Sequence, residues 1–234
     1  MIFDWLIAKW QVLASLLPVM LEGLWVTFEI SMIAIVCGSL LGFVLGVVRT
    51  LDYRIATALI GLYLHIFRGS PYLVQLYIIY FVLPATGVEW LQFDSFTAAI
   101  VSLSLYTSSY VTEIVAASID AVPRGQEEAA RSCGMSKSQA LRHVVLPQAV
   151  RMTVPPMASV YVVVIKSTAI LSVIGIAELT RQGEIAILRM PGDLMFIYCV
   201  IAGMYFVYCY PVLRFSRWAE KRIGSATGVR VDTD

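Results

Sequence analysis

Five long apolar segments, separated by polar stretches, dominate the hydrophobicity pattern of this 234-residue chain. Each is long enough to cross a membrane, since a spanning helix needs about 20 mostly apolar residues. We expect spans at 23–48, 55–83, 96–119, 154–174 and 194–213. The second should break near Pro71, because proline lacks a backbone donor and clashes with the preceding turn. The pattern therefore predicts an all-α integral membrane protein with about five transmembrane helices.

Glycines recur at every fourth residue of the first expected span, at Gly38, Gly42 and Gly46. Small residues at this spacing form a helix face that another backbone can approach closely. Residues 3–17 are apolar at helical spacing but too short to span, which favours an amphipathic helix lying in the membrane interface. The alternative for these residues is an N-terminal extension of the first span.

The expected division of the chain has three parts. An N-terminal interfacial segment covers 1–20, a transmembrane domain covers 21–215 and includes a polar loop at 120–150, and a tail covers 216–234. The beginning of the chain carries Asp4 where a signal peptide carries Lys or Arg, so we expect no cleaved signal.

Composition supports the membrane interpretation and excludes several functions. Hydrophobic residues make up 59% of the chain and charged residues 14%, against about 45–50% and 25% in soluble domains. The net charge of +1 does not favour a nucleic-acid partner. The four cysteines form no C-x-x-C pair, which argues against a metal site. Since the chain also lacks the G-x-x-x-x-G-K-[ST] phosphate loop, we expect neither an enzyme nor a cofactor of its own.

The lysines and arginines predict the orientation of the spans. Twelve fall in segments on one side of the membrane, and three (Lys9, Arg181 and Arg189) fall on the other. Positive residues gather on the cytoplasmic side. We therefore expect the N-terminus outside, the C-terminus inside and the loop at 120–150 in the cytoplasm.

That loop is polar and patterned as two short helices. Pro123 suits the first turn of a helix, and Gly134 suits the left-handed position that ends one. Ser136 and Gln139 have capping-box spacing and should begin a second helix, which Pro147 should end or kink. A charged helical loop between two spans predicts a docking surface for a soluble partner.

The loop resembles that of ABC importer permeases. Their pattern is Glu-Ala-Ala, three residues, Gly, nine residues, an aliphatic residue, one residue and Leu-Pro. This chain supplies it with Glu128, Ala129, Ala130, Gly134, Val144, Leu146 and Pro147, and its one departure is Val144 in place of the usual Ile.

Motifs outside the pattern narrow the resemblance to the polar amino-acid permeases of the histidine, arginine and glutamine type. They are Phe67–Pro71 with Val74–Leu76, Tyr110 with Glu113 and Ile114, Leu146–Ala149, and Lys166–Thr168. The resemblance covers about residues 20–220.

Several expectations follow from the resemblance alone. It implies a type I ABC importer permease in the cytoplasmic (inner) membrane of a bacterium, surrounded by membrane lipid. It also implies a second permease subunit, identical or related, a solute-binding protein outside the membrane, and two cytoplasmic ATPase subunits that hold ATP and Mg. The residues implied in coupling to the ATPase are Glu128, Ala129, Ala130, Gly134, Leu146 and Pro147.

Ionisable residues inside spans are costly and are therefore candidates for function. Lys166, or Ser167 and Thr168 beside it, is a candidate to meet the carboxylate of a transported amino acid. Glu113 is a candidate to balance a buried cation, which is either the solute or Lys166. The alternative is that these groups pair with one another or across the permease dimer. Arg68 is expected to satisfy carbonyls that the break at Pro71 sets free.

Three alternatives to a polar amino-acid importer stay open. The same machine could carry an opine, a compatible solute or a sulphur amino acid. A secondary transporter or channel is disfavoured, because two inverted repeats of similar length are not evident in the five spans. A membrane scaffold without transport is disfavoured by the polar residues within spans.

Overall fold

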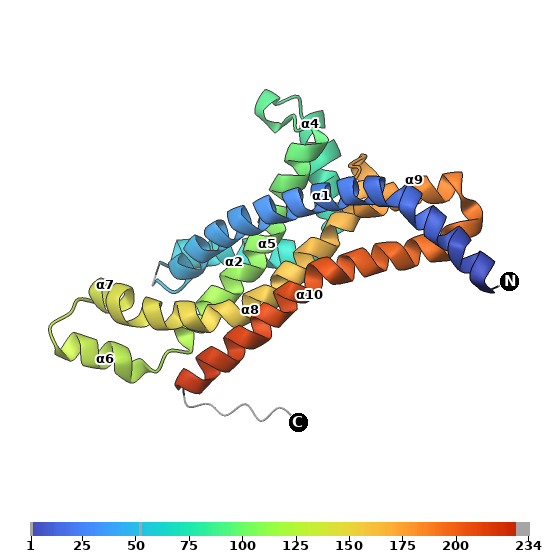
Figure 1. The fold of residues 1–234 in the computed structure, drawn as a ribbon. Coiled ribbons are helices and arrows are strands. Elements are labelled where there is room, and N and C mark those ends of the chain that lie inside the picture. Colours follow the sequence, from blue (N-terminus) through green and yellow to red (C-terminus); the bar gives the residue numbers. More distant parts are fainter. Residues whose placement is uncertain (1, 52, 228–234) are drawn as a thin grey trace.

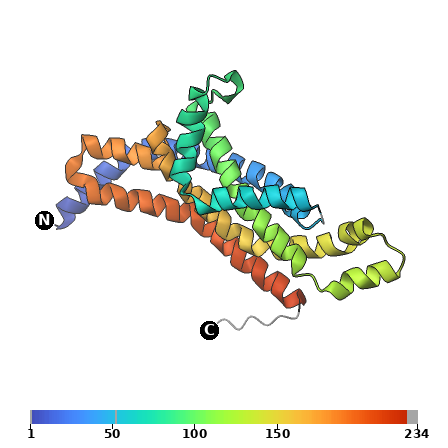
Figure 2. The same cartoon turned by 180° about the vertical axis from the view of Figure 1, so that it is seen from behind.

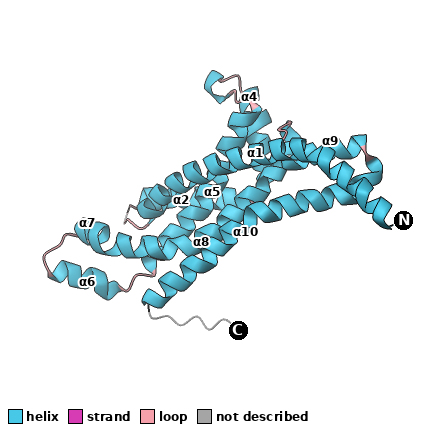
Figure 3. Cartoon of the chain, in the orientation of Figure 1, coloured by secondary structure: helices cyan, strands magenta, loops and turns pink. Residues whose placement is uncertain are grey.

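The computed structural model describes residues 2–51 and 53–227, and in these ranges it contains helices and no strand (Figures 1 and 3). The α-helices are α1 (Ile2–Arg49), α2 (Arg54–Gly69), α3 (Tyr72–Tyr77), α4 (Leu83–Ala85), α5 (Ser95–Asp120), α6 (Arg124–Ser132), α7 (Lys137–Ala140), α8 (Leu146–Ser167), α9 (Leu179–Arg189) and α10 (Leu194–Thr227). Two π-helical turns cover Ile78–Val82 and Leu141–Val145, and 3-10 turns cover Glu89–Leu91, Thr168–Ile174 and Pro191–Asp193. The end of the expected tail, 228–234 with Arg230, lies outside the described residues.

Four of the described helical stretches are long and apolar enough to cross a membrane. α2 and 72–85, which are bent by 108° at the break before α3, give a fifth span if the pair is taken as one. Figures 1 and 2 show α6 and α7 projecting at one end of the molecule, and α9 beside the N-terminus at the other. The predicted number of spans and the break at Pro71 are therefore confirmed.

The glycine stripe of α1 packs directly against α5. A Cβ added at Gly38, Gly42 or Gly46 would lie 2.5–2.6 Å from a β-carbon of α5, far inside ordinary carbon contact. The α5 residues met in this way are Thr107, Val111 and Val115. Glycine is needed here for close approach, so α1 and α5 form one tightly joined pair.

Residues 3–17 do not form a separate helix, which corrects the first of the two expectations for them. α1 runs without a break past Pro18 to Arg49. Leu16 and Met20 are buried against α9 and α10, and Lys9 pairs with Asp193 just before α10. These contacts explain why the helix continues, and they match an N-terminal extension of the first span. A position of these turns at the membrane interface stays a prediction.

The fourth span begins earlier than expected. The second loop helix does not end at Pro147 but continues from Lys137 to Ile174. A π-helical turn at 141–145 precedes Pro147, which then lies in the first turn of α8, where its missing donor costs little. Gln148 Nε2 donates to the Val144 carbonyl at 2.8 Å. The π-helical turn and the Gln148 hydrogen bond together let the helix continue through a proline that we expected to end or kink it.

Candidate functional site

The helix α6 ends as its glycine predicted. Gly134 has φ +88°, which is left-handed backbone that favours glycine. The Met135 N–H donates to the Ala130 carbonyl at 3.2 Å, and the Gly134 N–H donates to the Arg131 carbonyl at 2.9 Å. This pair of bonds is the Schellman motif, which satisfies carbonyls that a helix end leaves free.

The next helix begins with the predicted capping box. The Gln139 N–H donates to Ser136 Oγ at 3.3 Å, and the Ser136 N–H donates to Gln139 Oε1 at 2.8 Å. The end of α6 and the start of α7 are therefore each fixed by local hydrogen bonds within residues 130–139. The backbone where the two helices meet, residues 134–139, therefore forms a rigid corner.

Six loop residues carry the expected coupling role, and the structure divides them into two groups. Glu128, Ala129, Gly134 and Pro147 are exposed, whereas Ala130 is buried and Leu146 is half-buried. Leu146 packs on a cluster that joins the end of α5 to the start of α8. The first group can meet a partner, whereas Leu146 joins the start of α8 to the end of α5.

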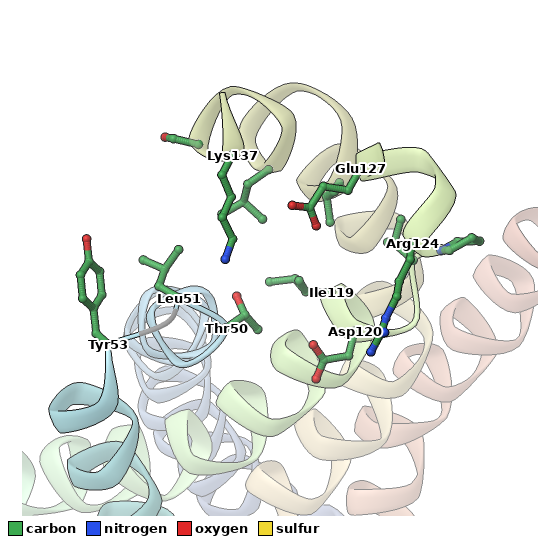
Figure 4. Close-up of a pocket in the computed structure, with 13 residues that line it drawn as sticks. Thr50, Leu51, Tyr53, Ile119, Asp120, Arg124, Glu127 and Lys137 are labelled. Atoms are coloured by element: carbon green, nitrogen blue, oxygen red, sulfur yellow. The ribbon is translucent and has the colours of Figure 1, made fainter. Parts of the chain in front are cut away.

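Two hollows flank α6. The smaller, about 620 Å³, is lined by residues of α6 and the corner, including Glu128 and Gly134. The larger, about 980 Å³, lies between α6, α7 and the turn that follows α1. Figure 4 shows the side chains of Glu127 and Lys137 directed into the larger hollow, with Thr50 and Leu51 on its opposite wall. The loop thus presents a grooved, charged surface.

The three candidate pathway residues are not brought together. Lys166 is exposed on α8, and no ion pair joins it to Glu113 in the described part of the chain. Thr168 is fully buried, and its hydroxyl donates to the Ile165 carbonyl at 2.7 Å. Contact of either with a solute stays a prediction.

Glu113 instead bridges two arginines. Its Oε2 lies 2.9 Å from Arg49 Nη1 and 2.8 Å from Arg68 Nη1. The Arg68 guanidinium also lies 5.5 Å from the centre of the Tyr110 ring. Pairing among the charged groups within the spans was one of the expected alternatives, and it occurs for Glu113 with Arg68 but not with Lys166.

The carbonyls freed by the break at Pro71 are satisfied by another side chain, which corrects the expectation for Arg68. Gln75 Nε2 donates to the Phe67 carbonyl at 2.8 Å and to the Ser70 carbonyl at 3.0 Å. Gln75 is buried and lies one turn past the proline, so its amide reaches back over the break. Its place in the sequence after Pro71 was the available signal.

Sequence reasoning also missed Glu178, which lies between the fourth and fifth spans and is fully buried. Its carboxylate caps α9 by accepting from the Thr180 and Arg181 N–H groups, each at 2.8 Å, and from Tyr205 Oη at 3.0 Å. Burial raises the pKa of this carboxyl above its ordinary value, and these hydrogen bonds oppose the shift. An acid directly before a helix was the signal for the cap.

Metal ligands do not gather in the described residues. No group of three or more His, Cys, Asp or Glu side chains there could hold a metal ion.

Comparisons with known proteins cover most of the chain. A family model described as "Binding-protein-dependent transport system inner membrane component" matches residues 34–225. The L-cystine transport system permease protein TcyB of Bacillus subtilis (strain 168) is 32% identical over 209 residues, which are 89% of this chain and 88% of the relative. The glutamine transport system permease protein GlnP of Escherichia coli (strain K12) is 34% identical over 175 residues, which are 75% of this chain and 80% of the relative.

Solved structures agree in fold. The crystal structure of an amino acid ABC transporter with histidines contains a chain that is 34% identical, with a TM-score of 0.81. The similarity covers 90% of this chain and 96% of that chain. A chain of the MetNI methionine ABC transporter has a TM-score of 0.65 at 20% identity, covering 87% of this chain and 97% of that one, which shows the fold alone.

Proposed function

We propose a function that proceeds from family membership: the chain belongs to the binding-protein-dependent transport system inner membrane components. It is the permease subunit of an ATP-driven importer that carries a polar amino acid across the cytoplasmic membrane. The expected fold, an all-α membrane protein with about five spans of the type I ABC importer permease kind, is confirmed. The named relatives carry cystine and glutamine, which supports an amino acid as the solute.

The observation that carries the proposal is the rigid corner at 134–139 with the exposed residues beside it. Glu128, Ala129 and Gly134 are exposed on α6 or directly after it, and α6 and α7 project at one end of the molecule (Figure 1). A rigid projecting helix is suited to receive a push from a soluble motor. The motor is a separate ATPase, which holds ATP and Mg, because this chain carries no phosphate loop of its own.

We assign the orientation from charge. The end with α6 and α7 faces the cytoplasm, since most lysines and arginines of the connecting segments lie there. The N-terminus and α9 then face outward, where a solute-binding protein delivers its cargo. A second permease subunit completes the pathway across the membrane.

Co-purification tests the proposal. The complex that co-purifies with a tagged copy of this chain should contain an ATPase subunit. Its hydrolysis of ATP should be stimulated by a polar amino acid together with the binding protein. Glu128→Arg should abolish co-purification of the ATPase, because it reverses the charge of an exposed side chain on α6. The control is Arg181→Gln, at an exposed position on α9. An ATPase that stays bound to E128R as well as to the control would refute α6 as the docking helix.

The transported amino acid is identified by which solute stimulates ATP hydrolysis. Glutamine, arginine, histidine and cystine should be tested for stimulation of ATP hydrolysis by the complex. Stimulation only by an opine or a compatible solute would support an ABC importer but would assign it a different transported solute.

A further inference from the structure

Three charged groups from three separate helices meet at one carboxylate oxygen. Arg49 is the last residue of α1, Arg68 lies in the last turn of α2, and Glu113 lies on α5. Both guanidinium groups approach Glu113 Oε2, at 2.9 and 2.8 Å. The three side chains are between 31% and 41% exposed, so the cluster is open to solvent or to a neighbour rather than sealed in the core.

The two ion pairs of this cluster, Arg49–Glu113 and Arg68–Glu113, join different pairs of helices. α1 and α5 are already held together by the glycine stripe, where backbones approach too closely for a β-carbon. The Arg49–Glu113 bond therefore lies within one unit. A bond inside such a unit changes little when the unit moves.

The Arg68–Glu113 ion pair instead joins α5 to α2, the first half of the bent span. α2 leaves Ile55, Leu59 and Leu62 about 60–80% exposed, and it is tied to α5 by Tyr63 Oη, which donates to the Leu105 carbonyl at 2.6 Å. Directly after Arg68 the chain turns by 108°. The Arg68–Glu113 bond thus joins the elbow of the bent span to the α1–α5 unit.

Glu113 also lies close to the loop that leads to α6. Seven residues of unbroken helix separate it from Asp120, which is about 10 Å along the axis. Three residues, 121–123, then separate α5 from α6, and the segment after α5 packs on the start of α8 through Val122 and Val145. A displacement of α6 that is carried by α5 therefore displaces Glu113.

We propose that Glu113 is a positioning residue that passes the movement of α6 to the bent second span through Arg68. The carboxylate keeps its bond to Arg49 as the α1–α5 unit moves, and it releases or regains Arg68 as the elbow opens or closes. This inference rests on the proposed function, in which α6 receives the push of the ATPase.

Charge explains why the carboxylate is needed. Arginine stays protonated in proteins, so Arg49 and Arg68 are both cations at the same oxygen. With Glu113 ionised, one anion holds two cations; with a neutral side chain at this position, the two cations repel each other. Because the cluster is partly exposed, its contribution to folding is small, and its effect should fall on the coupling of the movement.

The test compares Glu113→Gln with Glu184→Gln in the complete importer, reconstituted in proteoliposomes with its ATPase and binding protein. Glu184 forms an ion pair of similar exposure with Arg181, but within one helix, so it links no separate elements. The measured quantity is the amount of amino acid imported per ATP hydrolysed. We expect this ratio to fall roughly fivefold or more in E113Q, the lower range of allosteric coupling, and to stay at the wild-type value in E184Q.

Each other outcome decides against the inference. An unchanged ratio in E113Q overturns it. So does a proportional fall of import and hydrolysis, which would be a structural effect. If E113Q fails to assemble, Arg68→Gln, which removes the cation of the elbow and leaves the Arg49–Glu113 bond, carries the same expectation. Failure of both variants assigns the cluster to folding and overturns the inference. Failure of the proposed function is distinct, since the wild-type complex itself would then import nothing with ATP.

Discussion

Replacing Gly42 by alanine tests the close packing of α1 on α5 directly. The added β-carbon would lie 2.6 Å from Val111 Cβ and 2.8 Å from the Ser108 carbonyl oxygen. Carbon atoms in contact normally lie about 3.5–4.0 Å apart, so the helices must separate by about 1 Å. Neither obstacle is the end of a flexible side chain, and the local backbone has to move.

Two opposing terms set the magnitude. Alanine stabilises a helix interior over glycine by roughly 0.5–1 kcal/mol, and overpacking of a tight contact costs roughly 1–3 kcal/mol. At Gly203 on α10 nothing lies within 4 Å of an added β-carbon, so there only the gain applies. The gain is common to both variants and cancels, so we expect G42A to be less stable than G203A by roughly 1–3 kcal/mol.

The assay is SDS-induced unfolding of the purified subunit in mild detergent, followed by tryptophan fluorescence. G42A should unfold at a lower SDS fraction than wild type, and G203A at an equal or higher one. Equal shifts in the two variants would refute the close approach of α1 and α5.

Four further outcomes follow from the structure. Gly134→Ala should destabilise the loop by about 1–2 kcal/mol, because left-handed backbone disfavours a β-carbon, whereas Gly125→Ala on α6 should not; proteolysis of the loop compares them. Gln75→Leu should cost roughly 1–3 kcal/mol in SDS unfolding by leaving the carbonyls at the break unsatisfied, and full stability would contradict the assignment. The pKa of Glu178 is raised in the folded state, so its contribution to stability is largest at low pH and falls as pH rises through that pKa. The difference in melting temperature between wild type and E178Q should therefore fall as the pH is raised. A difference that does not change with pH would contradict burial as the dominant cause of the shift. Lys166→Met should abolish import while the complex still assembles, and unchanged uptake would remove Lys166 from the pathway.

Local sequence signals predicted the local structure of the loop. The helix stop at Gly134 and the capping box at Ser136 depend on residues within a few positions, and both are present. The glycine stripe also predicted a close helix contact, although it did not identify α5 as the partner. Such signals suffice where the bonds that satisfy a backbone come from neighbouring residues.

Contacts between distant segments were not predictable in the same way. The continuity of α1 depends on packing against α9 and α10, more than 150 residues away in the chain. The pairing of Glu113 with Arg49 and Arg68 was not predicted, because it depends on how α1, α2 and α5 pack together. The angle of the bend in the second span also cannot be predicted from a single sequence.

The central claim is that an ATPase drives this chain through α6. Its most direct test is uptake of a polar amino acid by proteoliposomes that contain the complete complex, with ATP on the side of α6 and no ion gradient. The account predicts accumulation that requires ATP and is lost in E128R. Equal accumulation without ATP, driven by an ion gradient alone, would contradict it and would favour a secondary transporter.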